Sequence, residues 1–213
     1  MVMRKSIGKS AALAALALVV AAGCGGGSGN NNDQGVVFLA TGTFRGQQSI
    51  QQGQITCVVP NASNAILDNT FTFNISTSVE FPSPNDAFAD PCGGYIGLQN
   101  NLTSQAINVQ EISVRYEIAG AGIGLPTQSI TVGQNIPSAS TTVVGPSGVP
   151  NLIFLNLQGQ IVPASVVVFL NQNVNHLPAT PYLMNVFMVA RGQSDDGTNY
   201  QTNEIGYQLT ITQ

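Results

Sequence analysis

Few residues of this sequence have the type and spacing that catalytic chemistry needs. His176 is the single histidine, and the Asn-Val-Asn-His-Leu-Pro segment around it has the composition of a loop. No Gly-x-Ser-x-Gly turn accompanies it, as a serine hydrolase of that type would need. One histidine and widely separated cysteines are also too few ligands for a zinc site. We therefore interpret His176 as an exposed loop residue.

One group of carboxylates has the composition of a turn. Asp195 and Asp196 precede Gly197, and Asn199 follows closely. Asp-Gly is first of all a hairpin-turn sequence, which is the interpretation we favour. Carboxylate, amide and carbonyl oxygens also suit Ca²⁺, so this turn is a weak calcium candidate.

A second pair of carboxylates, Asp86 and Asp90, stands shortly before Cys92. Two carboxyl groups perform the acid and base steps in most glycoside hydrolases, but they are equally suited to a solvated loop. We favour the loop. The sequence thus predicts a protein that is not an enzyme and that needs no cofactor.

The N-terminal segment has the features of a bacterial export signal. Three basic residues precede an apolar run over residues 11–22, which is too short to span a bilayer. The Ala-Ala-Gly-Cys sequence that ends this segment resembles the lipobox of bacterial lipoproteins. The resemblance implies that the signal peptide 1–23 is removed and that Cys24 is acylated with diacylglycerol and usually a further fatty acid such as palmitate. An ordinary cleavable signal with an incidental cysteine is the alternative.

The sequence after the lipobox suggests a tether and one domain. Residues 25–35 are rich in glycine and lack apolar side chains, so 24–35 would be a lipidated, flexible N-terminus with a reach of about 20 Å. Residues 36–213 would form the domain. Gly25, rather than aspartate, follows the cysteine, and in Gram-negative bacteria this resemblance implies the outer membrane. We expect a lipid-anchored protein of the cell envelope.

The charge balance excludes one class of partner. Three of the six basic residues precede Cys24, whereas all ten acidic residues follow it, which leaves the mature chain with a net charge of −7. Such a chain cannot neutralise a row of phosphates, so nucleic acid is not expected as a partner. The membrane, reached through the lipid, and an envelope protein or glycan remain.

Two cysteines remain once Cys24 is acylated. Cys57 and Cys92 would form a disulfide in the oxidising compartment outside the cytoplasm. Closing this loop would stabilise the fold by about 3 to 4 kcal/mol. Two separate, buried thiols are the alternative.

Alternating apolar and polar residues predict half-buried β-strands. The pattern is clearest over 71–81, 112–118 and 205–211, each with one apolar and one polar face. Glycine and proline separate most of the further strand candidates. These candidates are 37–44, 50–59, 128–132, 141–144, 152–157, 165–170 and 182–191. We predict an all-β, antiparallel two-sheet sandwich of about nine or ten strands, with no helix after the signal.

The C-terminal stretch 182–212 resembles the closing hairpin of bacterial immunoglobulin-like and fibronectin type III-like domains. This resemblance implies an immunoglobulin-like sandwich. Two apolar runs, 152–155 and 166–170, do not alternate, and we expect loops such as 120–134 to cover their second face. If they were exposed, they would mark a partner surface.

Two functions fit these observations. The first is a membrane-anchored structural or binding module, similar in role to an adhesion domain. The alternative is a carbohydrate-binding or carbohydrate-degrading surface protein, in which exposed tyrosines would stack on sugar rings. The tyrosines considered for that role are Tyr95, Tyr182, Tyr200 and Tyr207.

Overall fold

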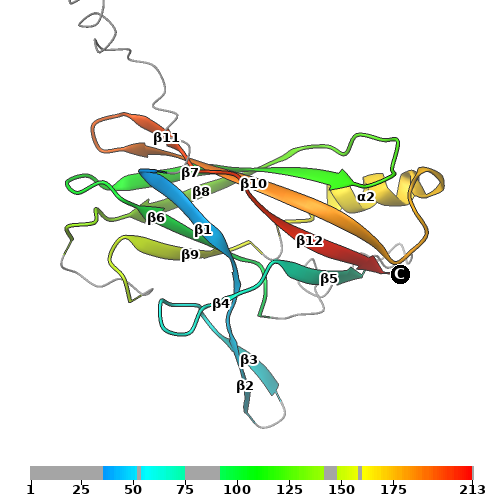
Figure 1. The fold of residues 1–213 in the computed structure, drawn as a ribbon, viewed down its shortest axis with the longest axis horizontal. Helices are drawn as coiled ribbons and strands as arrows, with labels where there is room; N and C mark the ends of the chain where they lie inside the picture. The colour runs from blue at the N-terminus through cyan, green and yellow to red at the C-terminus, as the bar shows by residue number, and fades with distance from the viewer. Residues whose placement is uncertain (1–35, 52–53, 75–91, 142–147, 158–159, 213) are drawn as a thin grey trace, which may run out of the picture. The chain divides into compact units, whose positions relative to one another are not determined.

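The computed structural model describes residues 36–51, 54–74, 92–141, 148–157 and 160–212. These residues form β-sheets, a short α-helix and a 3-10 turn (Figure 1). The helix is α2 (Ala164–Gln172) and the 3-10 turn is η1 (Val174–His176). The strands are β1 (Phe38–Arg45), β2 (Gln47–Gln51), β3 (Gln54–Val58), β4 (Ile66–Leu67), β5 (Thr70–Asn74), β6 (Tyr95–Asn100), β7 (Ile107–Ile118), β8 (Gln128–Ile136), β9 (Leu152–Asn156), β10 (Tyr182–Ser194), β11 (Asn199–Gln201) and β12 (Ile205–Thr212).

The largest sheet has the strand order β5-β12-β10-β7-β8, and β11 pairs with β10. The long strands β7 and β10 form its centre and run antiparallel, as the sequence predicts. The β5 strand runs parallel to β12, with Phe71 opposite Leu209. The prediction of a wholly antiparallel arrangement is therefore wrong at this edge, because β5 is joined to its neighbour through a long connection and not by a hairpin.

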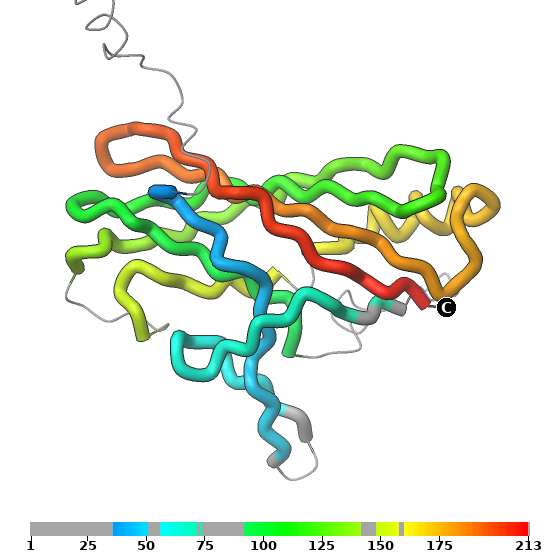
Figure 2. The backbone as a smooth tube through the Cα atoms, in the orientation of Figure 1, coloured from blue at the N-terminus to red at the C-terminus, as the bar shows by residue number. Residues whose placement is uncertain are grey.

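A second sheet has the order β4-β1-β6-β9, and β2 and β3 form a sheet of their own (Figure 2). Apolar side chains from both larger sheets belong to one hydrophobic core. Phe38 and Leu98 belong to the β4-β1-β6-β9 sheet, and Ile112 and Met184 belong to the largest sheet. All four side chains are fully buried. The fold is thus mostly β, and the two larger sheets both contribute side chains to its core.

Alternating burial is observed in the long strands. In β7, Ile112, Val114, Tyr116 and Ile118 are buried, as the sequence predicts. The strand extends further toward the N-terminus than expected, to Ile107. The pairing with β10 shifts register there, since Arg191 lies opposite Glu111 and Gly192 opposite Val109. Such a bulge exchanges the two faces of a strand, which is why the simple alternation of β7 breaks at this point.

The predicted strand 165–170 is wrong, because this run is α2. Val166 and Leu170 are the buried residues of the helix and lie four positions apart, on one helical face. Pro163 is the N-cap residue directly before the helix, where no intrahelical hydrogen bond needs the N–H that proline lacks. A short apolar run alone does not distinguish a buried strand from a helix.

The predicted strand 50–59 is also wrong in part, because the chain reverses within it to form β2 and β3. The prediction for 71–81 is supported as far as the structure describes it, since Phe71 and Phe73 are buried. Residues 75–81 and most of 141–144 lie outside the described residues, as do the export signal 1–23 and the tether 24–35.

Candidate functional site

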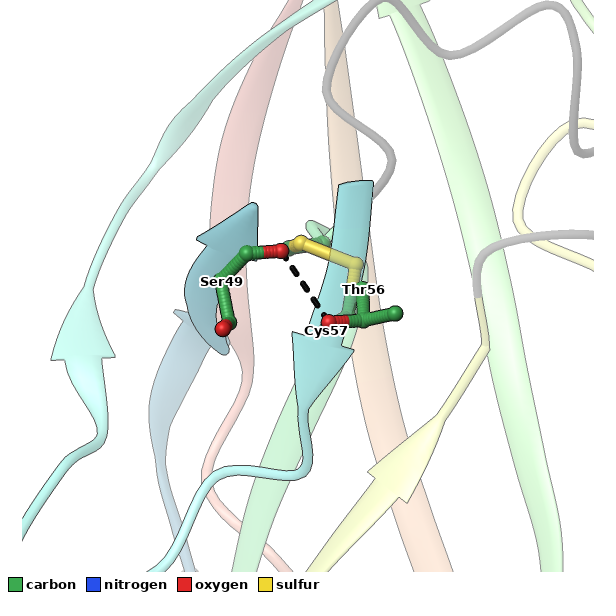
Figure 3. The surroundings of a disulfide bond; sticks show 4 residues. Ser49, Thr56 and Cys57 are labelled. Carbon is green, nitrogen blue, oxygen red and sulfur yellow. Dashed lines mark hydrogen bonds between the residues drawn. A yellow bond between two sulfur atoms is a disulfide. The ribbon is translucent and has the colours of Figure 1, made fainter. Parts of the chain in front are cut away.

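The small β2–β3 sheet is a hairpin that the chain forms between β1 and β4 (Figures 1 and 2). The two strands pair antiparallel with Ile50 opposite Ile55. The Thr56 hydroxyl donates a hydrogen bond of 3.0 Å to the carbonyl oxygen of Ser49 (Figure 3). Within the described part of the chain, no third strand joins this sheet. Two isolated strands are only marginally stable in water, so the hairpin depends on its attachment to the domain.

The attachment is covalent. Cys57, near the end of β3, forms a disulfide with Cys92, and their Cα atoms are 5.2 Å apart (Figure 3). Cys92 is fully buried just ahead of β6. Its carbonyl oxygen also accepts a hydrogen bond of 2.8 Å from the Gly46 N–H, at the start of the hairpin. The predicted disulfide is therefore confirmed, and it fastens the base of the hairpin to the domain.

Gly46 connects β1 to β2 where the chain is too crowded for a side chain. A Cβ atom placed there would lie 2.2 Å from the carbonyl oxygen of Val58. Any larger residue would therefore force β3 away from the start of β2. The hairpin thus depends on this close approach as well as on the disulfide.

Apolar side chains are exposed on the hairpin and on the neighbouring strand β4. The side chain of Ile50 is 74% exposed and that of Leu67 is 69% exposed, values unusual for large apolar residues. β4 pairs with the end of β1, directly before Gly46. We use the name hairpin surface for these exposed apolar residues taken together, which are Ile50, Val58, Val59, Ile66 and Leu67. In the β2–β3 register Ile50 and Val58 lie on opposite faces of the hairpin.

The hairpin surface lies in an uncharged stretch of chain. Residues 46–67 contain no Asp, Glu, Lys or Arg. The stretch is bounded by Arg45 and Asp68, whose side chains approach within 3.7 Å as an ion pair. These two charges balance each other, so the segment between them presents apolar and amide groups without net charge. Apolar patches of this kind mark interaction sites in soluble proteins.

The Asp195–Asn199 segment forms the turn between β10 and β11, as expected. Gly197 has a φ of +86°, which favours glycine in a tight turn. The Asn199 side-chain oxygen accepts a hydrogen bond from Gln193. No group of three or more metal-ligating His, Cys, Asp or Glu side chains occurs in the regions that the structure describes. The positions of these residues support the turn interpretation.

Both carboxylates of this turn accept hydrogen bonds from the protein. Asp196 accepts bonds from the Ser194 hydroxyl at 2.5 Å and from the Thr198 N–H at 3.0 Å. Asp195 accepts a bond from the Ala106 N–H. The bond from Ser194, followed by that from Thr198, lowers the pKa of Asp196 well below its usual range. The two residues thus join the β10–β11 turn to the segment before β7.

The other predicted site residues do not come together. His176 is exposed at the end of η1, as expected. Tyr95, Tyr182 and Tyr207 are buried, and Tyr200 is half-buried. Buried rings cannot stack on a sugar, so Tyr95, Tyr182 and Tyr207 are not available for that role, whereas Tyr200 is partly exposed. Cys24, Asp86 and Asp90 lie outside the described residues.

A pocket of about 350 Å³ lies where the 119–125 loop passes over β7 and β10. Its wall includes Ile118, Ile123 and Leu125 together with Glu117 and Asn185. Tyr116 also belongs to the lining, and the remaining lining residues are aliphatic or glycine.

No family model, curated protein or solved structure matches this chain. None of the described helices has the length and apolar character needed to cross a bilayer.

The sequence does not predict the hairpin surface. It gives 50–59 as a single strand candidate, although Gly53 interrupts the run and the absence of charge over 46–67 is visible in the sequence. Those two signals together could have indicated a hairpin with an unusual surface.

Proposed function

We propose that this protein is a lipid-anchored lipoprotein of a bacterial cell envelope whose domain acts as a structural or binding module, similar in role to an adhesion domain. The hairpin surface carries the binding part of this proposal. The resemblance of the Cys24 segment to a lipobox carries the anchoring part.

The anchor follows from the chemistry of Cys24. Acyl chains on this residue would hold the mature chain at the membrane, since each buried methylene contributes about 0.8 kcal/mol. Gly25 after the cysteine favours the outer membrane in a Gram-negative cell. Cys24→Ser should move the protein from the detergent phase to the aqueous phase when cells are fractionated. A mutant that stays in the detergent phase would refute the lipid anchor.

The binding role follows from how the hairpin is held. Exposed aliphatic side chains contribute about 25 cal/mol per Å² when a partner covers them. The disulfide between Cys57 and Cys92 and the close approach at Gly46 fix the hairpin before any partner arrives. Pre-organisation of this kind lowers the entropy lost on binding. The hairpin surface is therefore suited to protein contact.

Site-specific photocrosslinking in intact cells tests this role. A photoreactive residue at Ile50 should give covalent adducts. The same residue at Leu183, which is also at least half exposed but lies on β10, is the matched control and should give few. Equal yields at both positions would show that the hairpin surface is not a preferred contact.

We also propose that the two larger sheets pack face to face as an immunoglobulin-like sandwich. The shared core supports this packing, with Phe38 and Leu98 from one sheet and Ile112 and Met184 from the other. A crystal structure of the domain would test it through the angle between the two sheets.

A further inference from the structure

We infer that the partner of the hairpin surface is a second copy of this chain, and that two β2–β3 hairpins pair to form one continuous sheet. This inference rests on the proposed binding role. It adds the identity of the partner and the geometry of the contact.

The charge distribution favours a second copy. The mature chain is anionic, with three basic and ten acidic residues after the signal. Two like-charged molecules repel each other over most of their surfaces. The stretch 46–67 carries no charge, and the Arg45–Asp68 pair at its ends is internally balanced. Two copies can therefore approach at the hairpin without placing like charges opposite each other, whereas a basic partner would be drawn to acidic residues elsewhere.

The hairpin is incomplete as a sheet. In the described residues, β2 and β3 are each paired with one strand only. Two such hairpins related by a two-fold axis would give a sheet of four strands, a size that is stable where two strands are not. With the β2 strands of the two copies at the new junction, the exposed Ile50 side chain would gain cross-strand neighbours.

An amide side chain of the hairpin is self-complementary. Gln47 is exposed, and its amide both donates and accepts hydrogen bonds, so it can pair with the same group of a second copy. Stacked glutamine side chains and β-branched neighbours are typical of strands that associate with identical strands. Natural proteins usually prevent such pairing with lysine or proline on exposed strands. Residues 47–59 contain neither.

Two tagged copies of the full chain, produced together in the bacterium, test this inference. Both carry a photoreactive residue at Gln47, which is exposed on β2. We expect an adduct that contains both tags. Ile50→Glu in both copies should lower its yield about tenfold, because like charges would then meet across the new sheet. Leu183→Glu in both copies is the matched control and should leave the yield unchanged.

The decisive part of this experiment places opposite charges at residue 50 in the two copies. A copy with Ile50→Glu and a copy with Ile50→Lys should recover the two-tag adduct, which also shows that both variants fold. Failure of this recovery would overturn the inference. An adduct between one tagged copy and another protein would overturn the self-pairing but keep the proposed binding role. The absence of adducts at both Gln47 and Ile50 would overturn both proposals. Crosslinking to lipid alone would identify a membrane contact in place of a second copy.

Discussion

The disulfide between Cys57 and Cys92 joins the exposed hairpin to the buried part of the domain. Cys57 lies near the end of β3, while Cys92 is fully buried ahead of β6. A backbone hydrogen bond of 2.8 Å also joins these regions, from the Gly46 N–H to the Cys92 carbonyl oxygen. The bridge therefore links an exposed element to the buried part of the fold.

Replacing both cysteines with serine should destabilise the domain. The 35-residue separation of Cys57 and Cys92 predicts a loss of about 3 to 4 kcal/mol in the free energy of unfolding. Denaturant titration of the purified protein measures the loss, and a reducing agent added to the wild type should reproduce it. An unchanged midpoint in both cases would show that the bridge does not contribute to stability.

Gly192→Ala should destabilise the larger sheet at the β7 bulge. A Cβ on Gly192 would lie 2.7 Å from Ile107 Cγ2 and 2.9 Å from the Asn108 carbonyl oxygen. The resulting displacement should cost about 1 to 3 kcal/mol. Gly133→Ala in β8 is the matched control, because a Cβ there meets nothing within 4 Å. Similar thermal midpoints for the two variants would contradict the close approach.

Two buried tyrosines should respond differently to loss of the hydroxyl. The Tyr116 hydroxyl donates a hydrogen bond to the Ile161 carbonyl oxygen, so Tyr116→Phe should cost about 1 to 2 kcal/mol. The Tyr207 hydroxyl is buried and has no hydrogen-bond partner among the described residues. Tyr207→Phe should therefore be neutral or stabilising. Equal losses in chemical denaturation would indicate a partner for Tyr207.

Because of Asp196, the free energy of unfolding should fall at acid pH. Hydrogen bonds lower the pKa of Asp196 in the folded protein, so the unfolded chain binds its proton more readily. The stabilisation by Asp196 is complete at pH values above the usual aspartate pKa. It is lost as the pH falls toward the lower pKa that Asp196 has in the folded protein. Asp196→Asn should therefore flatten the decline of the denaturation midpoint below about pH 4. An identical decline in the variant would mean that Asp196 contributes nothing to it.

The alternation of residues predicted the burial pattern of β12 correctly. Tyr207, Leu209 and Ile211 are buried, and the intervening positions face outward, because each strand packs on the core with one face only. The same rule failed for residues 165–170. An apolar run without alternation has no periodicity that distinguishes a strand from a helix. Only the packing of Val166 and Leu170 shows that this run is helical.

The hairpin surface could not be predicted by the same means. Ile50 and Val58 have the residue types of a buried strand, and sequence alternation cannot show that nothing covers them. Their exposure depends on where the disulfide holds the hairpin, which is a property of the tertiary structure. The disulfide itself was predictable, because it required only that two cysteines remain in an exported chain.

Hydrogen exchange at the hairpin tests the central claim, that this surface is covered by a partner in the cell envelope. Exchange would be measured by mass spectrometry on the full chain in isolated membranes and after dispersal in detergent. The β8 strand is the internal control and should exchange equally in both. We predict that amides of β2 and β3 exchange more slowly in the membranes than in detergent. Equal exchange of the hairpin in both conditions would contradict the account.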